Sequence, residues 1–259
     1  MRLDNKEKVK ILRVDAGEAS WADDAVAAEA TLTIYVGGVE LLSLLYTPPM
    51  AVELALGYLL SEGLIKCKDD VSSLVLRKGS VLVGLNGAVP VSAPAARVLT
   101  SGCGGGITFT YPQGIKQIKK LRSGLTVPHE AVTALANRFR KESSLFEETG
   151  GVHSAALSDE AGFLAFAEDI GRHNAVDKVF GKCLMDGIDT RDKILLTTGR
   201  ISSEILLKAV KRAVPVIVSR GAPTSLAVTL ADRLGVTLAG FVRGRRMNIY
   251  THHERVKVK

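Results

Sequence analysis

One thiol lies in a run of residues that have almost no side chains, the segment SGCGGG at Ser101–Gly106. Glycine has no side chain to pack and adopts dihedral angles that other residues avoid, so the segment is predicted to be a loop that presents the sulfur of Cys103. A cysteine that only fills a core needs no such setting. Cys103 is therefore the candidate nucleophile, and the alternative is a glycine-rich turn that happens to contain a cysteine.

The other two cysteines have different surroundings. Cys183 shares a predicted helical face with Val176, Val179 and Phe180, so we expect it in the core, whereas Cys67 lies in the polar run KCKDD. Three cysteines in 259 residues do not form a disulfide framework. They favour a reducing compartment, and we expect a cytoplasmic protein.

Arginine recurs after four predicted strands in the second half of the chain. The segments are EDIGRHN (168–174), TTGRISSE (197–204), SRGAPTS (219–225) and VRGRRMN (242–248). Guanidinium groups bind phosphate oxygens in pairs, and glycine allows a backbone to approach a ligand closely. Ligands bind beyond the carboxyl ends of the strands in such sheets, so the four segments together predict a nucleotide or polyphosphate site.

The candidate binding residues of these segments are Arg172, His173, Gly199, Arg200, Ser202, Ser203, Ser219, Arg220, Thr224 and Arg243. For any one serine or threonine, capping of the following helix is the simpler interpretation. His173 and Asp177 are four residues apart, with Lys178 adjacent, which predicts a polar helix face directed at the same site. His252 and His253 have no cysteine or carboxylate at ligand spacing, so we predict no metal site.

The elements that position these residues differ between the two halves of the chain. In the first half we predict strands at 9–14, 30–36, 39–46, 73–77 and 81–85. We also predict a hairpin turn at Gly37-Gly38 and a helix over 50–60. The polar stretch 112–127 predicts a domain boundary, giving a smaller strand-rich α+β domain over 1–125 and a second domain over 126–259.

In the second half, strands and helices alternate. Strands are expected at 153–157, 163–167, 194–197, 216–219 and 236–241, and helices at 128–146, 175–184, 203–213 and 225–234. This order predicts an α/β fold with a largely parallel sheet covered on both faces, a three-layer α/β/α domain.

Composition narrows the class of partner. The hydrophobic fraction of 46% supports a real core, and no apolar run is long enough for a membrane span or a signal peptide. The net charge of +7 favours anionic partners, but aromatic residues make up only 5% of the chain. General nucleic-acid binding is therefore the weaker alternative, and we expect neither a nucleic acid nor a membrane as partner.

Several long motifs resemble those of the formate dehydrogenase accessory protein (FdhD) family. They are YTPPMAVELALGYLLSEG, SGCGGG, EDIGRHNAVDKVFG, TTGRISSEILLKAV and SRGAPTSLAVTLADRLGVTLAGFVRGRRMNIYTH, and they occur in the family's order over nearly the whole chain. The resemblance implies a sulfur carrier that takes persulfide sulfur from a cysteine desulfurase on Cys103. It would deliver this sulfur to a molybdenum cofactor destined for formate dehydrogenase.

The cofactor so implied is a bis(molybdopterin guanine dinucleotide), with GDP as a partial mimic. The resemblance further implies a C-terminal domain similar to the cytidine deaminase fold and cofactor binding by Phe241, Val242, Arg243, Gly244, Arg245 and Arg246. Zinc deaminases need a later pair of cysteine ligands, and this chain has none after His153. We therefore expect no deaminase activity.

The cysteine loop departs from many family members, which carry a second cysteine three residues after the first. Here that position is Gly106, so relay of sulfur between two thiols within the loop is not available. A persulfide needs only one thiolate, so Cys103 alone is sufficient for the predicted sulfur-carrier role. The alternative is a non-catalytic chaperone for the cofactor or for guanine nucleotides. One cofactor with two nucleotide arms would suit two identical sites, which predicts a homodimer.

Overall fold

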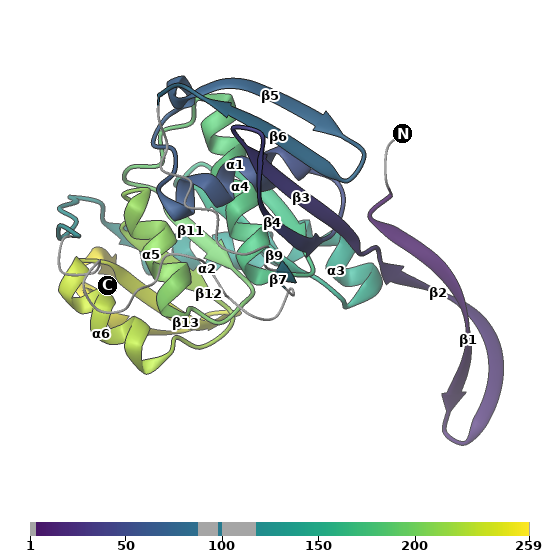
Figure 1. The fold of residues 1–259 in the computed structure, drawn as a ribbon. Helices are drawn as coiled ribbons and strands as arrows, with labels where there is room; N and C mark the ends of the chain where they lie inside the picture. Colours follow the sequence, from purple (N-terminus) through teal and green to yellow (C-terminus); the bar gives the residue numbers. More distant parts are fainter. Residues whose placement is uncertain (1–3, 88–97, 100–117, 259) are drawn as a thin grey trace.

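A computed structural model describes residues 4–87, 98–99 and 118–258 (Figure 1). The loop 101–106 lies outside these residues, so the prediction that it presents Cys103 stays a prediction. Within the described part, no helix is long and apolar enough to cross a membrane.

The second half of the chain is built on a six-stranded mixed sheet with the order β10-β9-β11-β12-β13-β14. Its strands are β9 (His153–Ser158), β10 (Phe163–Asp169), β11 (Ile194–Thr197), β12 (Val216–Ser219), β13 (Thr237–Arg243) and β14 (Arg246–Thr251). β11, β12 and β13 are parallel, as predicted, but the pairs β9–β10, β9–β11 and β13–β14 are antiparallel. The expectation of a largely parallel sheet was wrong because the tight turns at 159–162 and 244–245 return the chain directly beside the strand it has left.

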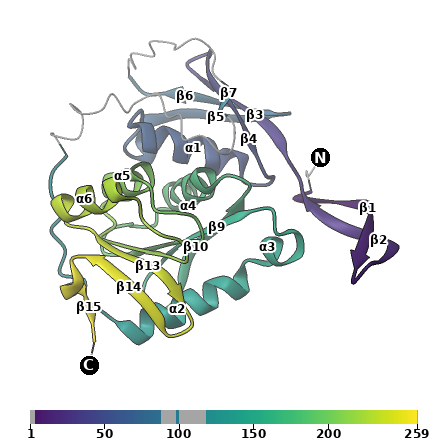
Figure 2. The same ribbon diagram turned by 90° about the horizontal axis from the view of Figure 1, so that it is seen from below.

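Helices cover both faces of this sheet, which confirms the three layers (Figure 2). α4 (Arg172–Asp186), α5 (Ser203–Lys211) and α6 (Ser225–Leu234) lie on one face, and α2 (His129–Glu142) lies on the other. Ile194 and Leu196 of β11 pack in the core beneath α2, whereas Leu195 packs in the core of the opposite face. Both faces of the central strands are therefore buried, which explains their unbroken apolar sequences. The similarity to the cytidine deaminase fold stays a prediction.

The helix predicted over 128–146 is divided in two. α2 ends at Glu142 and α3 (Ser144–Thr149) begins after Ser143, whose hydroxyl donates to the carbonyl oxygen of Phe139 at 3.0 Å. The Glu168 carboxylate accepts hydrogen bonds from the backbone of Leu145 and Phe146, at 3.2 and 3.1 Å. A carboxylate from the neighbouring strand thus caps the new helix, which the local sequence did not reveal.

The first half of the chain supplies a five-stranded sheet with the order β5-β6-β3-β4-β7. Its strands are β3 (Ala30–Val36), β4 (Val39–Tyr46), β5 (Val71–Arg77), β6 (Ser80–Leu85) and β7 (Val98–Leu99). Gly37 and Gly38 have φ of 58° and 84°, the positive values that a two-residue hairpin turn requires, so the predicted hairpin is confirmed. α1 (Ala51–Glu62) follows and ends at Gly63, whose φ is 79°.

α1 and α4 join the two halves in one core. A Cβ added to Gly57 would lie 1.8 Å from the carbonyl oxygen of Asp177, and one added to Gly181 would lie 1.8 Å from that of Glu53. Each glycine therefore faces the backbone of the other helix, and the two helices cross in direct contact. The domain boundary near residue 125 stays a prediction. Just after it, β8 (Val127–Pro128) pairs in parallel with β15 (Val256–Lys257).

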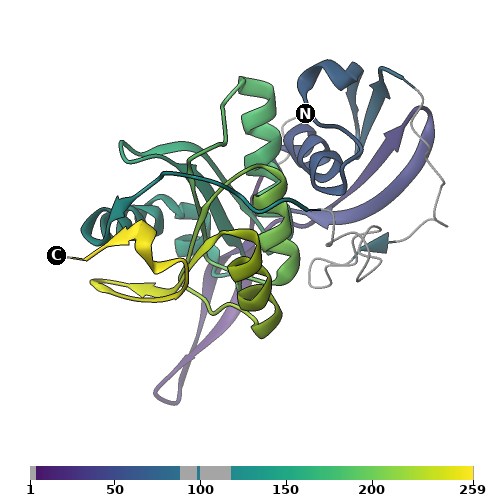
Figure 3. The same cartoon turned by 90° about the vertical axis from the view of Figure 1, so that its left-hand side faces the viewer.

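An extended hairpin at the start of the chain projects away from the rest of the molecule (Figures 1 and 3). It consists of β1 (Lys6–Asp15) and β2 (Glu18–Ala27), which pair along their whole length. The first strand was predicted over a shorter range, whereas the polar sequence of the second gave no strand signal. We call this hairpin the N-terminal arm.

Candidate functional site

The carboxyl ends of β11, β12 and β13 meet the start of β9 at one edge of the sheet. Because β9 runs antiparallel to β11, its first residue, His153, lies beside the end of β11. The ring Nδ1 of His153 is 3.2 Å from the hydroxyl of Thr198, and the amide of Thr198 donates to Ser154 at 3.0 Å. The four arginine-containing segments therefore converge on this edge, which we call the arginine edge: Arg172, Arg200, Arg220 and Arg243.

Hydrogen bonds between neighbouring loops hold this edge together. The buried hydroxyl of Ser219 donates to the carbonyl oxygen of Gly199 at 2.6 Å and accepts from the amide of Gly221 at 2.9 Å. The amide of Phe241 donates to Gly221 at 3.0 Å. A Cβ added to Gly221 would lie 3.1 Å from the carbonyl oxygen of Gly199. Ser219 and Gly221 thus hold neighbouring loops together.

Two of the candidate hydroxyls cap helices. Ser202 accepts a hydrogen bond from the amide of Ile205 at 3.4 Å, and Thr224 accepts from Ala227 at 3.3 Å. They begin α5 and α6, and Ser203 is the first residue of α5. The simpler interpretation, that these side chains cap helices, is confirmed for Ser202 and Thr224.

Arg220 and Arg243 form a cationic group with an arginine that the sequence did not identify. Burial lowers the pKa of the half-buried Arg220, and the neighbouring charges of Arg140 and Arg243 lower it further. Arg140 comes from α2, which reaches the β13–β14 turn through a hydrogen bond from Asn137 Nδ2 to the carbonyl oxygen of Gly244, at 3.2 Å. Arg140 does not follow a predicted strand. Its position beside Arg220 depends on how α2 packs against the sheet, so the sequence did not predict it.

A second cationic group lies around Arg172 and Arg200. A Cβ added to Gly199 would lie 2.8 Å from the Cβ of Arg172, so this glycine makes room for the arginine stem. Burial lowers the pKa of His153, and the charges of Arg172 and Arg200 act in the same direction. At neutral pH the His153 imidazole is therefore uncharged beside two guanidinium groups.

Six exposed or half-buried arginines at this edge form no ion pair with a carboxylate in the described part of the chain. This holds for Arg140, Arg200, Arg220, Arg243, Arg245 and Arg246. Like charges held together without counter-ions create a positive potential, which favours an anionic ligand. The edge has the charge and the donors that a polyphosphate needs.

His173 follows Arg172 at the start of α4, and 12% of its side chain is exposed. Burial, together with the charges of Lys208 and Arg172, lowers its pKa to about 3. Its Nε2 is 3.3 Å from a carboxylate oxygen of Glu204, in a geometry that makes no hydrogen bond. At neutral pH His173 is thus an uncharged ring close to the charges of Arg172 and Lys208.

The prediction that Asp177 and Lys178 point toward the site was wrong. Their exposed fractions are 2% and 1%. Lys178 Nζ lies 2.7 Å from Asp169 Oδ2 and donates to the carbonyl oxygen of Thr47 at 2.5 Å. Asp177 pairs with Lys208 and accepts from Ser61 at 2.5 Å. These partners belong to two other helices, to the last residue of β10 and to the residue after β4, which no helical pattern in the sequence predicts.

The segment 241–246 contributes side chains of different kinds. Phe241 has φ of 52° and an exposed fraction of 39%, so a left-handed backbone holds an aromatic ring at the surface. The Val242 side chain is buried in the core under α2. Gly244, with φ of 59°, forms the turn between β13 and β14, beside the exposed Arg245 and Arg246.

The two described cysteines fit their predicted settings. Cys183 is buried, and this burial raises its pKa to about 12, so its thiolate is scarce at neutral pH. Cys67 is exposed. Cys103 lies outside the described residues. Among the residues that the structure describes, no three His, Cys, Asp or Glu side chains gather as metal ligands do.

Known proteins match this chain over nearly its whole length. The model of the FdhD/NarQ family matches residues 27–257. Relatives named "Sulfur carrier protein FdhD" include one from Bacillus licheniformis, 40% identical over 252 residues with 96% of each chain covered. Another, from Halalkalibacterium halodurans, is 42% identical over 253 residues, with 95% of this chain and 94% of the relative covered.

A solved structure has the same fold. The crystal structure of a formate dehydrogenase accessory protein from Desulfotalea psychrophila is 25% identical, with a TM-score of 0.80, and the match covers 98% of this chain and 100% of that chain. Family, relatives and fold agree. This chain belongs to the FdhD/NarQ family.

Proposed function

We propose that this protein is a sulfur carrier that accepts sulfur on Cys103 and delivers it to a molybdenum cofactor for formate dehydrogenase. The names of its relatives support the carrier role and the association with formate dehydrogenase. The observation that carries the cofactor-binding part is the arginine edge, where guanidinium groups from three loops and from α2 lack carboxylate partners within the described chain.

The loading step requires one thiolate and one donor. The Cys103 thiolate attacks the terminal sulfur of a persulfide on a cysteine desulfurase. The donor's S–S bond breaks, its cysteine leaves as a thiolate, and a persulfide now stands on Cys103. One persulfide is consumed and one is formed, so no oxidant or reductant is needed. Cys183 is unsuited to this step because burial keeps it protonated.

The arginine edge fits the charged part of the proposed cargo, a bis(molybdopterin guanine dinucleotide). Its pyrophosphate groups need several cationic donors, and Arg220 and Arg243 form one such group with Arg140. Arg200 forms the other with Arg172. The surface ring of Phe241 offers a face on which a purine base can stack. GDP carries the same guanine and diphosphate and is the simplest probe.

Sulfur loading is tested by incubating the full chain with an active cysteine desulfurase and isotope-labelled cysteine. Peptide mass spectrometry should find the labelled sulfur adduct on Cys103 and none on the buried Cys183. The Cys67→Ser variant is the matched control, because it removes an exposed thiol and should keep the label. Absence of label on Cys103, while the desulfurase is active, would refute the carrier role.

A second candidate function is a cofactor chaperone without sulfur transfer. The observation that favours it is Gly106, which stands where the family resemblance implies a second cysteine. Under this alternative, a Cys103→Ser variant would still support the maturation of active formate dehydrogenase in a host that lacks its own accessory protein. The carrier role predicts that the same variant abolishes this activity while it still binds GDP.

A further inference from the structure

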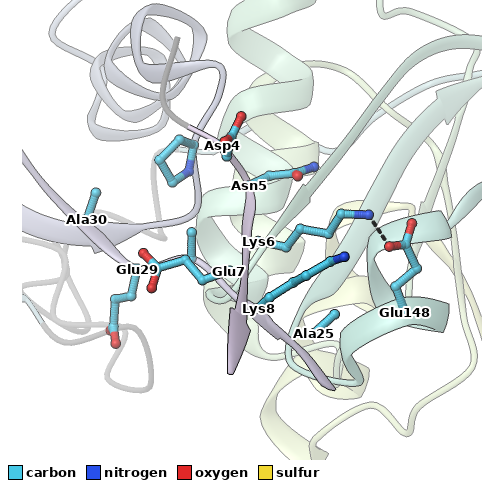
Figure 4. A pocket seen from close by; sticks show the side chains of 11 residues that line it. Asp4, Asn5, Lys6, Glu7, Lys8, Ala25, Glu29, Ala30 and Glu148 are labelled. Carbon is cyan, nitrogen blue, oxygen red and sulfur yellow. Dashed lines mark hydrogen bonds and ion pairs between the residues drawn. The ribbon is translucent and has the colours of Figure 1, made fainter. Parts of the chain in front are cut away.

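A cavity of about 690 Å³ lies at the base of the N-terminal arm (Figure 4). Side chains of both charge signs line it, and Lys6 pairs with Glu148 within this lining. Because opposite charges share one lining, this cavity selects neither an anion nor a cation. A smaller cavity, of about 280 Å³, has a different character, since mainly apolar side chains border it.

The smaller cavity lies under β5, the edge strand of the five-stranded sheet, and we call it the β5 groove. The sheet rests on α1, and the end of α4 lies beside α1 (Figure 2). The apolar walls of the groove come from β5, from α1 and from the end of α4: Leu56, Val71, Leu74, Leu184 and Met185. The groove is thus built by both halves of the chain.

β5 extends past the helices that cover its neighbour. Leu74 and Leu76 lie opposite Val83 and Val81 of β6, so the four side chains share one face of the sheet. The two valines are buried, whereas Leu74 and Leu76 are 37% and 60% exposed. The face that buries β6 in the core therefore continues at β5 as an open apolar surface.

β5 also has an open backbone edge. It pairs with β6 on one side, and no described strand lies on its other side. In an antiparallel pair, every second residue directs its N–H and C=O away from the partner strand, so β5 offers a row of unpaired donors and acceptors. Proteins protect such edges with proline or with charge, but residues 71–76 of β5 contain neither. An open, apolar and unprotected edge is typical of a site where a further strand is added.

Both ends of this surface are positively charged. Lys68 lines the groove just before β5 and donates to the carbonyl oxygen of Met185 at 3.3 Å. Arg77 and Lys78 lie at the other end of β5. None of these three cations forms an ion pair with a carboxylate in the described ranges. The nearby Asp70 carboxylate accepts two backbone amides of its own loop instead, at 2.6 and 3.1 Å.

We propose that β5 docks an extended segment of a partner protein, which adds a strand to the five-stranded sheet at the free edge of β5. The segment has apolar residues at alternate positions, because only alternate side chains of a strand reach the groove. It has acidic residues at its ends, which face Lys68 at one end and Arg77 with Lys78 at the other. A helix is excluded as occupant because it satisfies its own backbone groups and leaves those of β5 open.

Fluorescence anisotropy with a labelled synthetic peptide tests this docking. In the peptide, valine alternates with threonine, and two glutamates stand at each end. The full chain should bind it about tenfold or more tightly than a peptide of the same composition whose valines are grouped together, because grouping directs half of the valines away from the groove. A wild type that does not bind the alternating peptide, or binds both peptides equally, would overturn the proposal.

Substitutions in the groove locate the binding. Leu74→Asp and Leu76→Asp should each weaken binding of the alternating peptide by about tenfold or more, since a carboxylate replaces an apolar contact. Two partly exposed positions are used so that at least one variant keeps its fold, which circular dichroism checks. Val39→Asp is the matched control, because Val39 is 44% exposed but lies on β4. Equal loss of binding in the control and the groove variants would place the peptide elsewhere.

A charge reversal tests the acidic character of the occupant. Lys68→Glu should weaken binding of the glutamate-ended peptide, and a lysine-ended peptide should bind this variant more tightly than it binds the wild type. Lys119→Glu makes the same charge change at an exposed position close to the end of α6, and it should change neither affinity. If the wild type and Lys68→Glu have the same preference for the two peptides, the occupant is not selected by charge.

N-methylation of the peptide tests the addition of a strand. Two peptides, methylated at neighbouring central amides, keep the same side chains but lose different donors. Only one of them should still bind, because neighbouring amides of a strand point in opposite directions. Equal binding by both would show that no strand is added to β5.

Sedimentation equilibrium separates a partner protein from a second copy of this chain as the occupant. Leu74→Asp should have the same mass as the wild type. It should also bind GDP as the wild type does, because the groove lies at the end of α4 and Arg172 at its start. A lower mass of the variant would show that another copy covers the groove, which would overturn the proposal.

Discussion

Burial lowers the pKa of Arg220, and its two guanidinium neighbours, Arg140 and Arg243, lower it further. Such crowding costs free energy in the absence of a counter-ion, and an anion that binds there removes the cost. The sequence predicted most of this cationic site, because Arg172, Arg200, Arg220 and Arg243 each follow a predicted strand. The contribution of Arg140 was not predicted, since this residue lies on a helix whose orientation depends on its packing against the sheet.

The residue-scale prediction concerns this cationic group. Arg220→Ala and Arg243→Ala should each weaken GDP binding by about tenfold to a hundredfold, since a hydrogen bond to a charged group contributes about 1.5–3 kcal/mol. Isothermal titration calorimetry at low salt measures the change. Arg77→Ala, on the exposed face of β5, is the control and should bind GDP like the wild type. Unchanged affinity in both edge variants would exclude this group as the phosphate site.

Helices and strands were predicted well where the signal is local. The Gly37-Gly38 hairpin and the strands around it follow from turn residues and alternating apolar positions, and α6 follows from its apolar spacing and its Thr224 cap. The break at Ser143 was missed because the carboxylate that caps α3 comes from Glu168. The antiparallel strand β14 was missed because its apolar signal is weak and its partner is decided by the β13–β14 turn.

The element-scale prediction concerns the crossing of α1 and α4. Gly57→Ala should destabilise the fold by about 3 kcal/mol or more, because its Cβ would lie 1.8 Å from the Asp177 carbonyl oxygen, and backbone atoms cannot move aside cheaply. Urea unfolding followed by circular dichroism measures the loss. Gly124→Ala is the matched control, since a Cβ there would meet nothing within 4 Å. If both variants unfold at the same urea concentration, the helices are not in backbone contact.

The molecule as a whole joins its two halves through buried polar groups as well as apolar ones. The Lys178–Asp169 pair is almost fully buried and connects α4 to the end of β4 through the Thr47 carbonyl oxygen. Removal of one partner of such a pair leaves an uncompensated charge, which is strongly destabilising. Sequence alone predicted two sets of elements, but Lys178 and Thr47 are 131 residues apart and become neighbours only on folding.

The whole-molecule prediction concerns pH. In the folded chain the pKa of His173 is lowered from 6.5 to about 3. Below pH 6.5 the unfolded chain therefore takes up a proton that the folded chain does not, and stability falls by about 1.4 kcal/mol per pH unit from this group. Glu204, whose pKa is raised by burial, acts in the opposite direction, whereas His153 acts in the same direction.

Comparison of variants isolates the contribution of His173. Urea unfolding of His173→Gln between pH 7 and pH 5 should show a smaller loss of stability than the wild type, by about 2 kcal/mol at pH 5. His253→Gln is the control, because this exposed ring should leave the pH dependence as it is in the wild type. An equal slope in wild type and His173→Gln would contradict a neutral, buried His173.

Trp21 is the single tryptophan of the chain, and it lies on the outer half of the N-terminal arm with 74% of its surface exposed. The intrinsic fluorescence of the protein therefore reports on the arm, and the shared core of α1, α4 and the mixed sheet contributes no tryptophan signal. A fluorescence titration with denaturant would follow the melting of a ribbon, whereas circular dichroism would follow the body. The two curves need not coincide, and their separation would measure the independence of the arm rather than a folding intermediate.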